Sequence, residues 1–239
     1  EAPPAAEASP AEASPAEASP AEASPAEASP AEAPPLQLDS TQNNTKQTVT
    51  TLRTIRAEVQ DCTKCKLHAG RQKAVFGEGA PNARVMFIGE APGAREDQTG
   101  RPFVGEAGQL LDRILKNAMG LERAEVFIAN VNKCRPPANR TPEADEVAAC
   151  LPYLHRQIEI VQPEVLVCLG RTAAQNLLGS TESTTKLRQK QHEHQGIPVI
   201  VTWHPAYLLR EPSRKREAWE DIKRVNHLLG LPEDPSAST

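Results

Sequence analysis

Aromatic residues and long apolar runs are scarce in this chain. Eight of its 239 residues are aromatic (four Phe, two Trp and two Tyr), so an aromatic side chain in a polar loop stands out. The longest apolar runs, such as residues 165–169, are far shorter than the roughly 20 residues that a membrane-spanning helix needs. The N-terminus has no charged segment followed by an apolar one, so no secretory signal is expected.

Basic residues are absent from the first 35 positions, which hold seven of the 31 acidic residues and nine of the 22 prolines. Five consecutive copies of Ala-Glu-Ala-Ser-Pro fill residues 6–30, and a proline every five residues prevents a long helix. We expect a disordered acidic tail and linker over residues 1–45, a globular domain over 46–230 and a flexible C-terminus over 231–239. Without the tail the net charge changes from −4 to +3, because 27 basic and 24 acidic residues remain.

Short apolar runs alternate with helical patterns through the rest of the chain. The runs predict buried strands at residues 84–89, 125–131, 164–170 and 197–202. Apolar residues spaced by three and four predict helices at residues 47–61, 105–119, 142–161, 171–178 and 213–229. Thr141 is the expected N-cap of the helix that starts at Pro142. The alternation is typical of α/β proteins and predicts a three-layer α/β/α sandwich around a central, mostly parallel sheet of about four strands.

Polar segments follow three of the four predicted strands. They are residues 89–93 (GEAPG), 130–132 (NVN) and 203–205 (WHP). The carboxyl ends of parallel strands meet at one edge of a sheet, where ligands commonly bind, so these segments are candidates for a single site. The first segment does not fit G-x-G-x-x-G, and no Gly-Lys-Ser/Thr follows it, which excludes both common phosphate-binding loops.

Further segments border this candidate site. Residues 94–105 form a polar loop that carries Phe103, which either packs into the core or offers a flat surface on which a base stacks. A basic cluster forms either a solvated helix face or a phosphate-binding edge. It consists of Arg210, Arg214, Lys215 and Arg216, with Lys223 and Arg224 further along the last predicted helix. His192 and His194 have the spacing of an exposed edge strand, and we interpret them as surface residues.

Five cysteines, an odd number, favour a metal or cluster site in a reducing compartment over a disulfide scaffold. Cys62 and Cys65 form a C-x-x-C pair, Cys134 follows the second predicted strand, and Cys150 lies on the next predicted helix. Four thiolates in this arrangement can hold a tetrahedral zinc ion or an iron–sulfur cluster, and spacing alone does not distinguish the two. Cys168 lies inside an apolar strand and is expected to be a buried thiol.

Several motifs occur together in a fixed order. They are DCTKCKLHAGR, VFGEG, GEAPGAREDQTGRPFVGEAGQLLD, NVNKCRPPANRTP, the CLPYL around Cys150, and WHPAYLLR. In this combination the chain resembles the family 4 uracil-DNA glycosylases, the iron–sulfur branch of the uracil-DNA glycosylase superfamily. Glu90 followed by Ala91 matches the family 4 form of the first motif. The short RPPANR segment lacks the basic, His-bearing insertion of a relative that captures the sugar covalently, so turnover is expected.

The resemblance implies an enzyme that flips uracil out of single- or double-stranded DNA and hydrolyses its N-glycosidic bond. The product is an abasic site, the first intermediate of base excision repair. The resemblance also implies a structural 4Fe–4S cluster, with zinc as the alternative that spacing leaves open. Its ligands are then Cys62, Cys65, Cys134 and Cys150.

The resemblance assigns roles to individual residues at the reacting base. His204 is expected to donate to uracil O2, Asn130 to pair with uracil O4 and N3, and Phe103 to stack on the flipped base. Glu90 is expected to hold the attacking water or offset the positive charge on the sugar, and the backbone of Ala91 to position that water.

Other residues are implied at the rim of the site. Glu96 is expected to crowd the methyl group of thymine, so that normal DNA is spared. Tyr207 and Leu208 are expected to fill the space that the flipped base vacates. Arg210 and its basic neighbours are expected to grip phosphates.

A non-catalytic DNA-binding module that carries a cluster, attached for example to a polymerase, is the alternative function. Such a module uses the basic patch and the cysteines but has no need of Glu90 or Asn130. For the enzyme we expect a monomer that acts in the cytoplasm, at the nucleoid, on uracil-containing DNA. The acidic tail is a candidate contact for a repair or replication partner, although no docking motif stands out in it.

Overall fold

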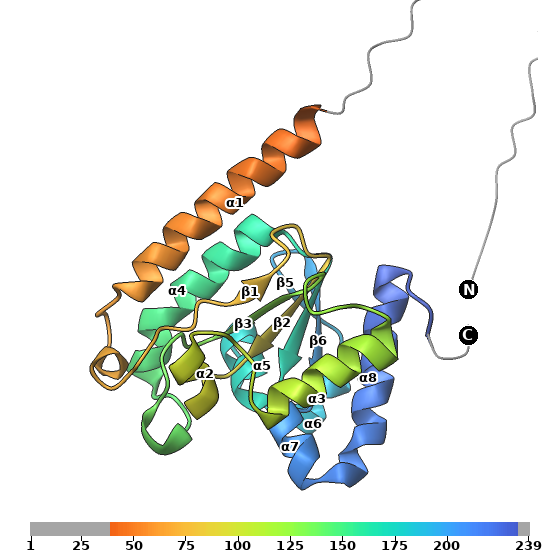
Figure 1. Ribbon diagram of the computed structural model, residues 1–239. Helices are drawn as coiled ribbons and strands as arrows, with labels where there is room; N and C mark the ends of the chain where they lie inside the picture. The colour runs from red at the N-terminus through yellow and green to blue at the C-terminus, as the bar shows by residue number, and fades with distance from the viewer. Residues whose placement is uncertain (1–38, 234–239) are drawn as a thin grey trace, which may run out of the picture. The chain divides into compact units, whose positions relative to one another are not determined.

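A six-stranded sheet forms the centre of residues 39–233, the part of the chain that the computed structural model describes (Figure 1). Its strand order is β1-β3-β2-β4-β6-β5, with the bounds β1 Glu78–Gly79, β2 Val85–Gly89, β3 Phe127–Asn130, β4 Val165–Leu169, β5 His192–His194 and β6 Ile197–Thr202. The four central strands are parallel, whereas β1 and β5 pair antiparallel with β3 and β6. The predicted parallel sheet is confirmed, and two short edge strands extend it.

Helices cover both faces of this sheet. Their bounds are α1 Asp39–Gln60, α2 Ala94–Thr99, α3 Glu106–Ile114, α4 Ala144–Val161, α5 Arg171–Leu178, α6 Thr184–Arg188, α7 Pro205–Arg210 and α8 Lys215–Leu229. Shorter turns are η1 Lys66–Ala69, η3 Pro137–Asn139, η4 Pro212–Arg214 and η2 Leu115–Met119, a π-helical turn that continues α3. None of the helices within residues 39–233 is both long enough and apolar enough to cross a membrane.

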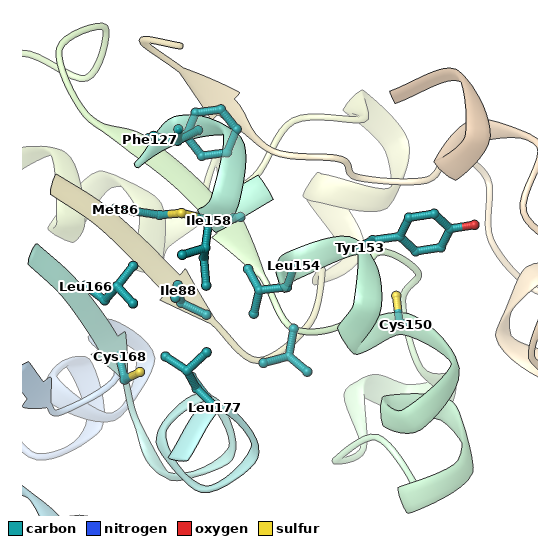
Figure 2. Close-up of a cluster of buried hydrophobic side chains, with 14 of the residues drawn as sticks. Met86, Ile88, Phe127, Cys150, Tyr153, Leu154, Ile158, Leu166, Cys168 and Leu177 are labelled. Atoms are coloured by element: carbon teal, nitrogen blue, oxygen red, sulfur yellow. The ribbon is translucent and has the colours of Figure 1, made fainter. Parts of the chain in front are cut away.

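Alternate side chains of the strands enter two separate cores. Met86 and Ile88 lie in one core with residues of α1, α4, α5 and α6, whereas Val85 and Phe87 lie in the other with residues of α3 and α8. Figure 2 shows the first core, where side chains of α4 meet those of β2 and β4. Because the central strands are buried on both faces, the predicted three-layer α/β/α arrangement is confirmed.

Helix α1 begins earlier than the sequence pattern predicted. Residues 39–45 were assigned to the linker, but they are helical. No proline follows Pro35 before the predicted helix start, so nothing interrupts the helix on its N-terminal side. Its apolar stripe, which includes Ile55 and Val59, packs in the same core as α4. The rest of the predicted tail lies outside the described residues.

Two other local predictions were wrong. The N-cap of α4 is Glu143 and not Thr141, because Glu146 Oε2 accepts a hydrogen bond from the Glu143 backbone N–H at 2.8 Å and completes a capping box. Residues 94–105, predicted as a loop, begin with helix α2, which ends at Gly100 in a left-handed conformation (φ 77°). Glu96 and Asp97 lie in the first turn of α2, where acidic side chains stabilise a helix.

The two histidines of the predicted edge strand lie on β5, at the edge of the sheet as expected. They are half-buried, however, and not free surface residues. A ring nitrogen of His192, Nε2, lies 2.8 Å from the Leu187 carbonyl oxygen, and the His194 ring lies 5.3 Å from the ring of His155.

Candidate functional site

The carboxyl ends of β2, β3 and β6 border one cavity of about 410 Å³. Predicted site residues from all three strand ends line it, namely Glu90, Ala91, Glu96, Phe103, Asn130, His204, Tyr207 and Arg210. A larger hollow of about 770 Å³ between α8 and the β5–β6 edge contains none of these residues. Residue chemistry, and not size, therefore identifies the candidate site.

Gly89, the last residue of β2, lies directly beside the side chains of Asn130 and Phe103. A Cβ atom at this position would lie 2.3 Å from Asn130 Oδ1 and 2.6 Å from Phe103 Cζ. Both distances are too short for any side chain, so glycine is required for Asn130 and Phe103 to approach each other here. The backbone pairing of Gly89 with Asn130 in the parallel β2–β3 ladder fixes this approach.

Phe103 is held in an unusual backbone conformation. Its φ is 50°, in the left-handed region that non-glycine residues rarely adopt, and its side chain is buried. Arg123 Nη1 donates to the Phe103 carbonyl oxygen at 3.1 Å, and a Cβ atom on Gly108 would lie 1.8 Å from the same oxygen. The strained segment aims the ring into the cavity, where its centroid lies 5.7 Å from that of His204.

Glu96 ties the Phe103 segment to helix α2. Its Oε1 accepts hydrogen bonds from the backbone N–H groups of Val104 and Gly105, both at 2.8 Å. A Cβ atom on Gly93 would lie 2.8 Å from Glu96 Oε2, so the strand-end loop also approaches this carboxylate closely. Glu96 thus has a structural task that the sequence did not predict, in addition to lining the cavity.

Asn130 carries a buried acceptor without a partner. Its side chain is 2% exposed, and within the described residues no donor reaches Oδ1. Leaving a buried amide oxygen unpaired costs about 1–3 kcal/mol. Of the five buried side-chain atoms without a partner in the described residues, Asn130 Oδ1 is the one whose residue lines this cavity. The amide therefore fits a ligand that presents a donor and an acceptor side by side.

His204 caps helix α7, and this fixes which ring nitrogen carries hydrogen. Its Nδ1 accepts a hydrogen bond from the Ala206 backbone N–H at 3.1 Å. Burial, and then the nearby Arg210 charge, lower the pKa of His204 to about 4, although Glu96 opposes this. The imidazole is therefore neutral near pH 7 with its hydrogen on Nε2, so it is a hydrogen-bond donor from that atom.

Glu90 and Ala91 follow Gly89 on the wall of the cavity. The Glu90 carbonyl oxygen accepts from the Asn132 backbone N–H at 3.0 Å, which extends the β2–β3 pairing beyond the strands. Among the described residues, no hydrogen bond or ion pair engages the Glu90 carboxylate. It is therefore available to a bound molecule.

The predicted rim residues lie on helix α7, and their side chains differ in how far they are exposed to solvent. Tyr207 is half-buried, and its ring lies 5.0 Å from that of Trp203. Leu208 is 1% exposed and packs against Leu110 and Ala218, which argues against the prediction that its side chain inserts into DNA. The neighbouring Leu209 is exposed instead, at 37%.

The basic cluster after α7 is only partly free. Arg214 and Lys223 form ion pairs with Glu217 and Glu220. Arg210, which borders the cavity, is exposed. Arg210 is therefore the member of this cluster that lies at the candidate site.

Four of the five cysteines line a second, small cavity: Cys62, Cys65, Cys134 and Cys150. Arg71 Nη1 donates to Cys134 Sγ and the Lys133 backbone N–H donates to Cys150 Sγ, both at 3.2 Å. Burial raises the pKa of both thiols, that of Cys150 to about 11, and these donors act in the opposite direction. Four sulfur side chains around one small cavity nevertheless fit a metal centre. Within residues 47–233, no three or more His, Cys, Asp or Glu side chains are arranged to hold a metal ion directly.

The fifth cysteine lies elsewhere, as predicted. Cys168 is fully buried on β4, and Figure 2 shows it apart from Cys150 on α4. Burial raises the pKa of its thiol to about 12, so it remains protonated. All five cysteines are free, without disulfides.

Sequence reasoning missed two residues beside the candidate site, Lys133 and Arg140. Lys133 is 1% exposed, and its Nζ donates to the Asn130 carbonyl oxygen at 2.7 Å and to Gln157 Oε1 at 2.6 Å. Arg140 lines the site cavity of about 410 Å³, and its two terminal nitrogens donate to the Glu146 carboxylate at 2.8 and 2.6 Å. Only their place in the NVNKCRPPANRTP segment, next to a predicted site residue and a predicted ligand, hinted at these roles.

Comparisons with known proteins find one family model and several relatives that cover most of this chain. The model of the Uracil DNA glycosylase superfamily matches residues 76–223. A type-4 uracil-DNA glycosylase from Sulfurisphaera tokodaii is 47% identical over 189 residues, 76% of this chain and 86% of that protein. One from Thermotoga maritima is 46% identical over 179 residues, 73% of this chain and 93% of that protein. A type-5 uracil-DNA glycosylase from Thermus thermophilus is 31% identical over 216 residues, 73% of this chain and 98% of that protein.

Proposed function

Because this chain belongs to the uracil-DNA glycosylase superfamily, in its type-4 branch, we propose that it removes uracil from DNA. The enzyme hydrolyses the N-glycosidic bond and leaves an abasic site, the first step of base excision repair. One observation carries the assignment: a single cavity joins an unpaired buried amide, a neutral histidine and an aromatic ring. A DNA-binding module without catalysis has no use for this combination.

Uracil is recognised in the cavity after it leaves the base stack, since its glycosidic bond is inaccessible inside a duplex. Asn130 Oδ1 accepts from the N3–H of uracil and the amide nitrogen donates to O4. Cytosine presents an unprotonated N3 and an amino group, so both contacts turn into mismatches of donors or acceptors. Phe103 provides the flat surface on which the base stacks.

Bond cleavage leaves negative charge on uracil and positive charge on the sugar. The His204 Nε2–H donates to uracil O2 as that negative charge grows. A water molecule attacks the sugar carbon as the bond to uracil breaks, and its released proton passes to solvent or to the departing base. Glu90, whose carboxylate is unengaged, binds this water or offsets the positive sugar, and the Ala91 backbone helps to position the water.

The rim residues select and hold the substrate. Glu96, fixed by its two backbone hydrogen bonds, crowds the position of a 5-methyl group and so excludes thymine. Arg210 grips a phosphate, and Tyr207 borders the space that the flipped base leaves. We do not retain Leu208 in this role because its side chain is buried.

The cofactor proposed for the second cavity is a 4Fe–4S cluster held by Cys62, Cys65, Cys134 and Cys150. Bound there, the cluster supplies a structural cross-link between the segment after α1, the segment after β3, and α4. It takes part in no step of base removal. Zinc is the alternative occupant, and metal analysis distinguishes it from an iron–sulfur cluster.

The cysteine assignment predicts the metal content of two matched variants. Cys150→Ser is expected to lose most of its iron and to unfold at a lower temperature, because a ligand to the cross-link is gone. Cys168→Ala is expected to keep about four iron and four sulfide per chain, since this thiol lies in the core. Iron and sulfide assays with visible absorption check this. Stoichiometric zinc in a colourless wild-type protein contradicts it.

Gly89→Ala is expected to lower kcat by about 100-fold or more, since displacing catalytic groups by about 1 Å has effects of this size. The new methyl group would meet Asn130 Oδ1 at 2.3 Å and push the amide and the Phe103 ring apart. Gly70→Ala is the matched control, because a Cβ atom there meets nothing within 4 Å. Single-turnover base release measures both, and equal rates for the two variants contradict the proposed contact.

The function itself is tested with synthetic DNA that carries one uracil, as a single strand and as a duplex. Incubation with the folded, metal-loaded protein followed by alkali is expected to break the strand at uracil and not at cytosine or thymine. An intact strand rejects the proposed activity. The same assay gives the strand preference. We propose a monomer that acts on DNA in the cytoplasm, with the acidic tail as the region that contacts a repair or replication partner.

A further inference from the structure

Lys133 lies between the two cavities, and its environment is unusual for a charged residue. It lines the cysteine cavity, and its side chain ranks among the largest that are fully buried. Within the described residues, no carboxylate forms an ion pair with its ammonium group. Burying a charge without such a partner is costly, so its retention needs an explanation.

The hydrogen bonds of Lys133 connect it to the base-recognition side of the site. Nζ donates to the carbonyl oxygen of Asn130 at 2.7 Å, at the end of β3. Its second acceptor, Gln157 Oε1, lies 2.6 Å away, and Gln157 Nε2 donates in turn to the Phe76 carbonyl oxygen at 2.8 Å. Gln157 is itself fully buried on α4. The ammonium therefore fixes the peptide of Asn130 against a rigid helix.

The backbone of Lys133 connects it to the cysteine side. Its N–H donates to Cys150 Sγ at 3.2 Å, and its carbonyl oxygen accepts from the Val75 N–H at 2.7 Å. Cys134 is the next residue in the chain. Bound to a metal, Cys150 would be a thiolate, whose negative charge opposes the lowering of the Lys133 pKa by burial.

We propose that Lys133 is a positioning residue that holds Asn130 in place for uracil recognition and couples it to the cysteine cavity. This inference rests on the proposed role of Asn130. It explains why one five-residue segment carries the uracil-reading amide, the buried lysine and a cluster ligand. Lys133 touches neither the base nor the sugar, so it acts only through Asn130.

The test replaces Lys133 by methionine, which keeps the length of the side chain and removes the charge and donors. We expect Lys133→Met to lower kcat by about 10- to 100-fold, as is typical when a residue that orients an active-site group is lost. The KM for uracil-containing DNA and the affinity for uracil-free DNA stay unchanged, because phosphate contacts are intact. Affinity for free uracil, measured by calorimetry, falls in parallel. Lys116→Met, at an exposed lysine, is the matched control.

A double-mutant cycle with Asn130→Ala decides whether Lys133 acts through Asn130. We expect Lys133→Met to cause no further loss of kcat in the Asn130→Ala background. An iron-loaded Lys133→Met protein with wild-type kcat and uracil affinity overturns the inference, and so does an equal loss in both backgrounds. If Lys133→Met does not fold or retain iron, Gln157→Leu is used instead, because it removes the second partner of Nζ. A wild-type kcat and uracil affinity of this variant, or an equal loss of kcat with and without Asn130→Ala, then overturns the inference. Wild-type activity of Asn130→Ala overturns the proposed role of Asn130 itself, a result distinct from the failure of Lys133 alone.

Discussion

Asn130→Ala is expected to lower kcat for uracil release by at least about 100-fold, because it removes both hydrogen bonds that identify the base. The loss arises from a specific property of this amide: its Oδ1 is buried and has no protein partner among the described residues. No protein group in the described residues pairs with this acceptor, and in the proposed complex the uracil N3–H does so. Removing an unpaired buried group costs little folding stability, so the effect falls on catalysis.

The control for this prediction is Asn117→Ala, at an exposed asparagine beside α3. Both variants are expected to unfold within about 4 °C of the wild type, the shift that roughly 1 kcal/mol produces in a domain of this size. Single-turnover kinetics on DNA with one uracil, together with binding to uracil-free DNA, separate recognition from folding. Full activity of Asn130→Ala, or loss of DNA binding along with activity, contradicts the role that we assign.

His204→Ala is expected to lower kcat by about 10²–10³-fold, the usual effect of removing one preorganised donor to a developing negative charge. The donor is preorganised because Nδ1 is occupied by the Ala206 N–H at 3.1 Å, which leaves hydrogen on Nε2. Gly170 lets the ring approach, since a Cβ atom there would lie 2.9 Å from His204 Cβ. His227→Ala, at an exposed histidine on α8, is the matched control, and equal rates for the two variants would refute the assignment.

The same histidine predicts a pH dependence. Its pKa is about 4 in the folded protein, against an ordinary value of 6.5. Between these values the unfolded chain binds the proton and the folded chain does not, so the His204 contribution to stability is complete above pH 6.5 and is lost as pH falls towards 4. Thermal unfolding of the wild type and His204→Ala across this range measures the difference. A wild-type stability that rises on acidification relative to the variant contradicts a neutral imidazole.

The sheet and the location of the site were predictable from the sequence for physical reasons. Strands buried on both faces need unbroken apolar runs, and β4 and β6 coincide with such runs. Parallel strands end at a common edge, so the polar residues Asn130 and His204, each next to a strand end, had to come together. No long-range information was needed for this inference.

Other features depend on packing that local patterns do not encode. Leu208 and Leu209 are identical residues in adjacent positions, and only the docking of α7 against Leu110 decides which one is buried. A lysine is normally exposed, so apart from its place between Asn130 and Cys134 the sequence did not indicate that Lys133 is buried. The capping of α4 likewise depends on which side chain reaches the free N–H groups, and Glu143 does so where Thr141 was expected.

The most direct measurement of the central claim is the release of free uracil by the wild-type protein and by a variant that combines Asn130→Ala with His204→Ala. Both are loaded with metal, and their affinity for uracil-free DNA is measured in parallel. We predict that the wild type releases uracil and leaves an alkali-labile site. The double variant should bind DNA equally well but release uracil about 10³-fold more slowly or worse. Equal release by the two proteins, or no release by the wild type, contradicts the assignment of this cavity as the site of uracil excision.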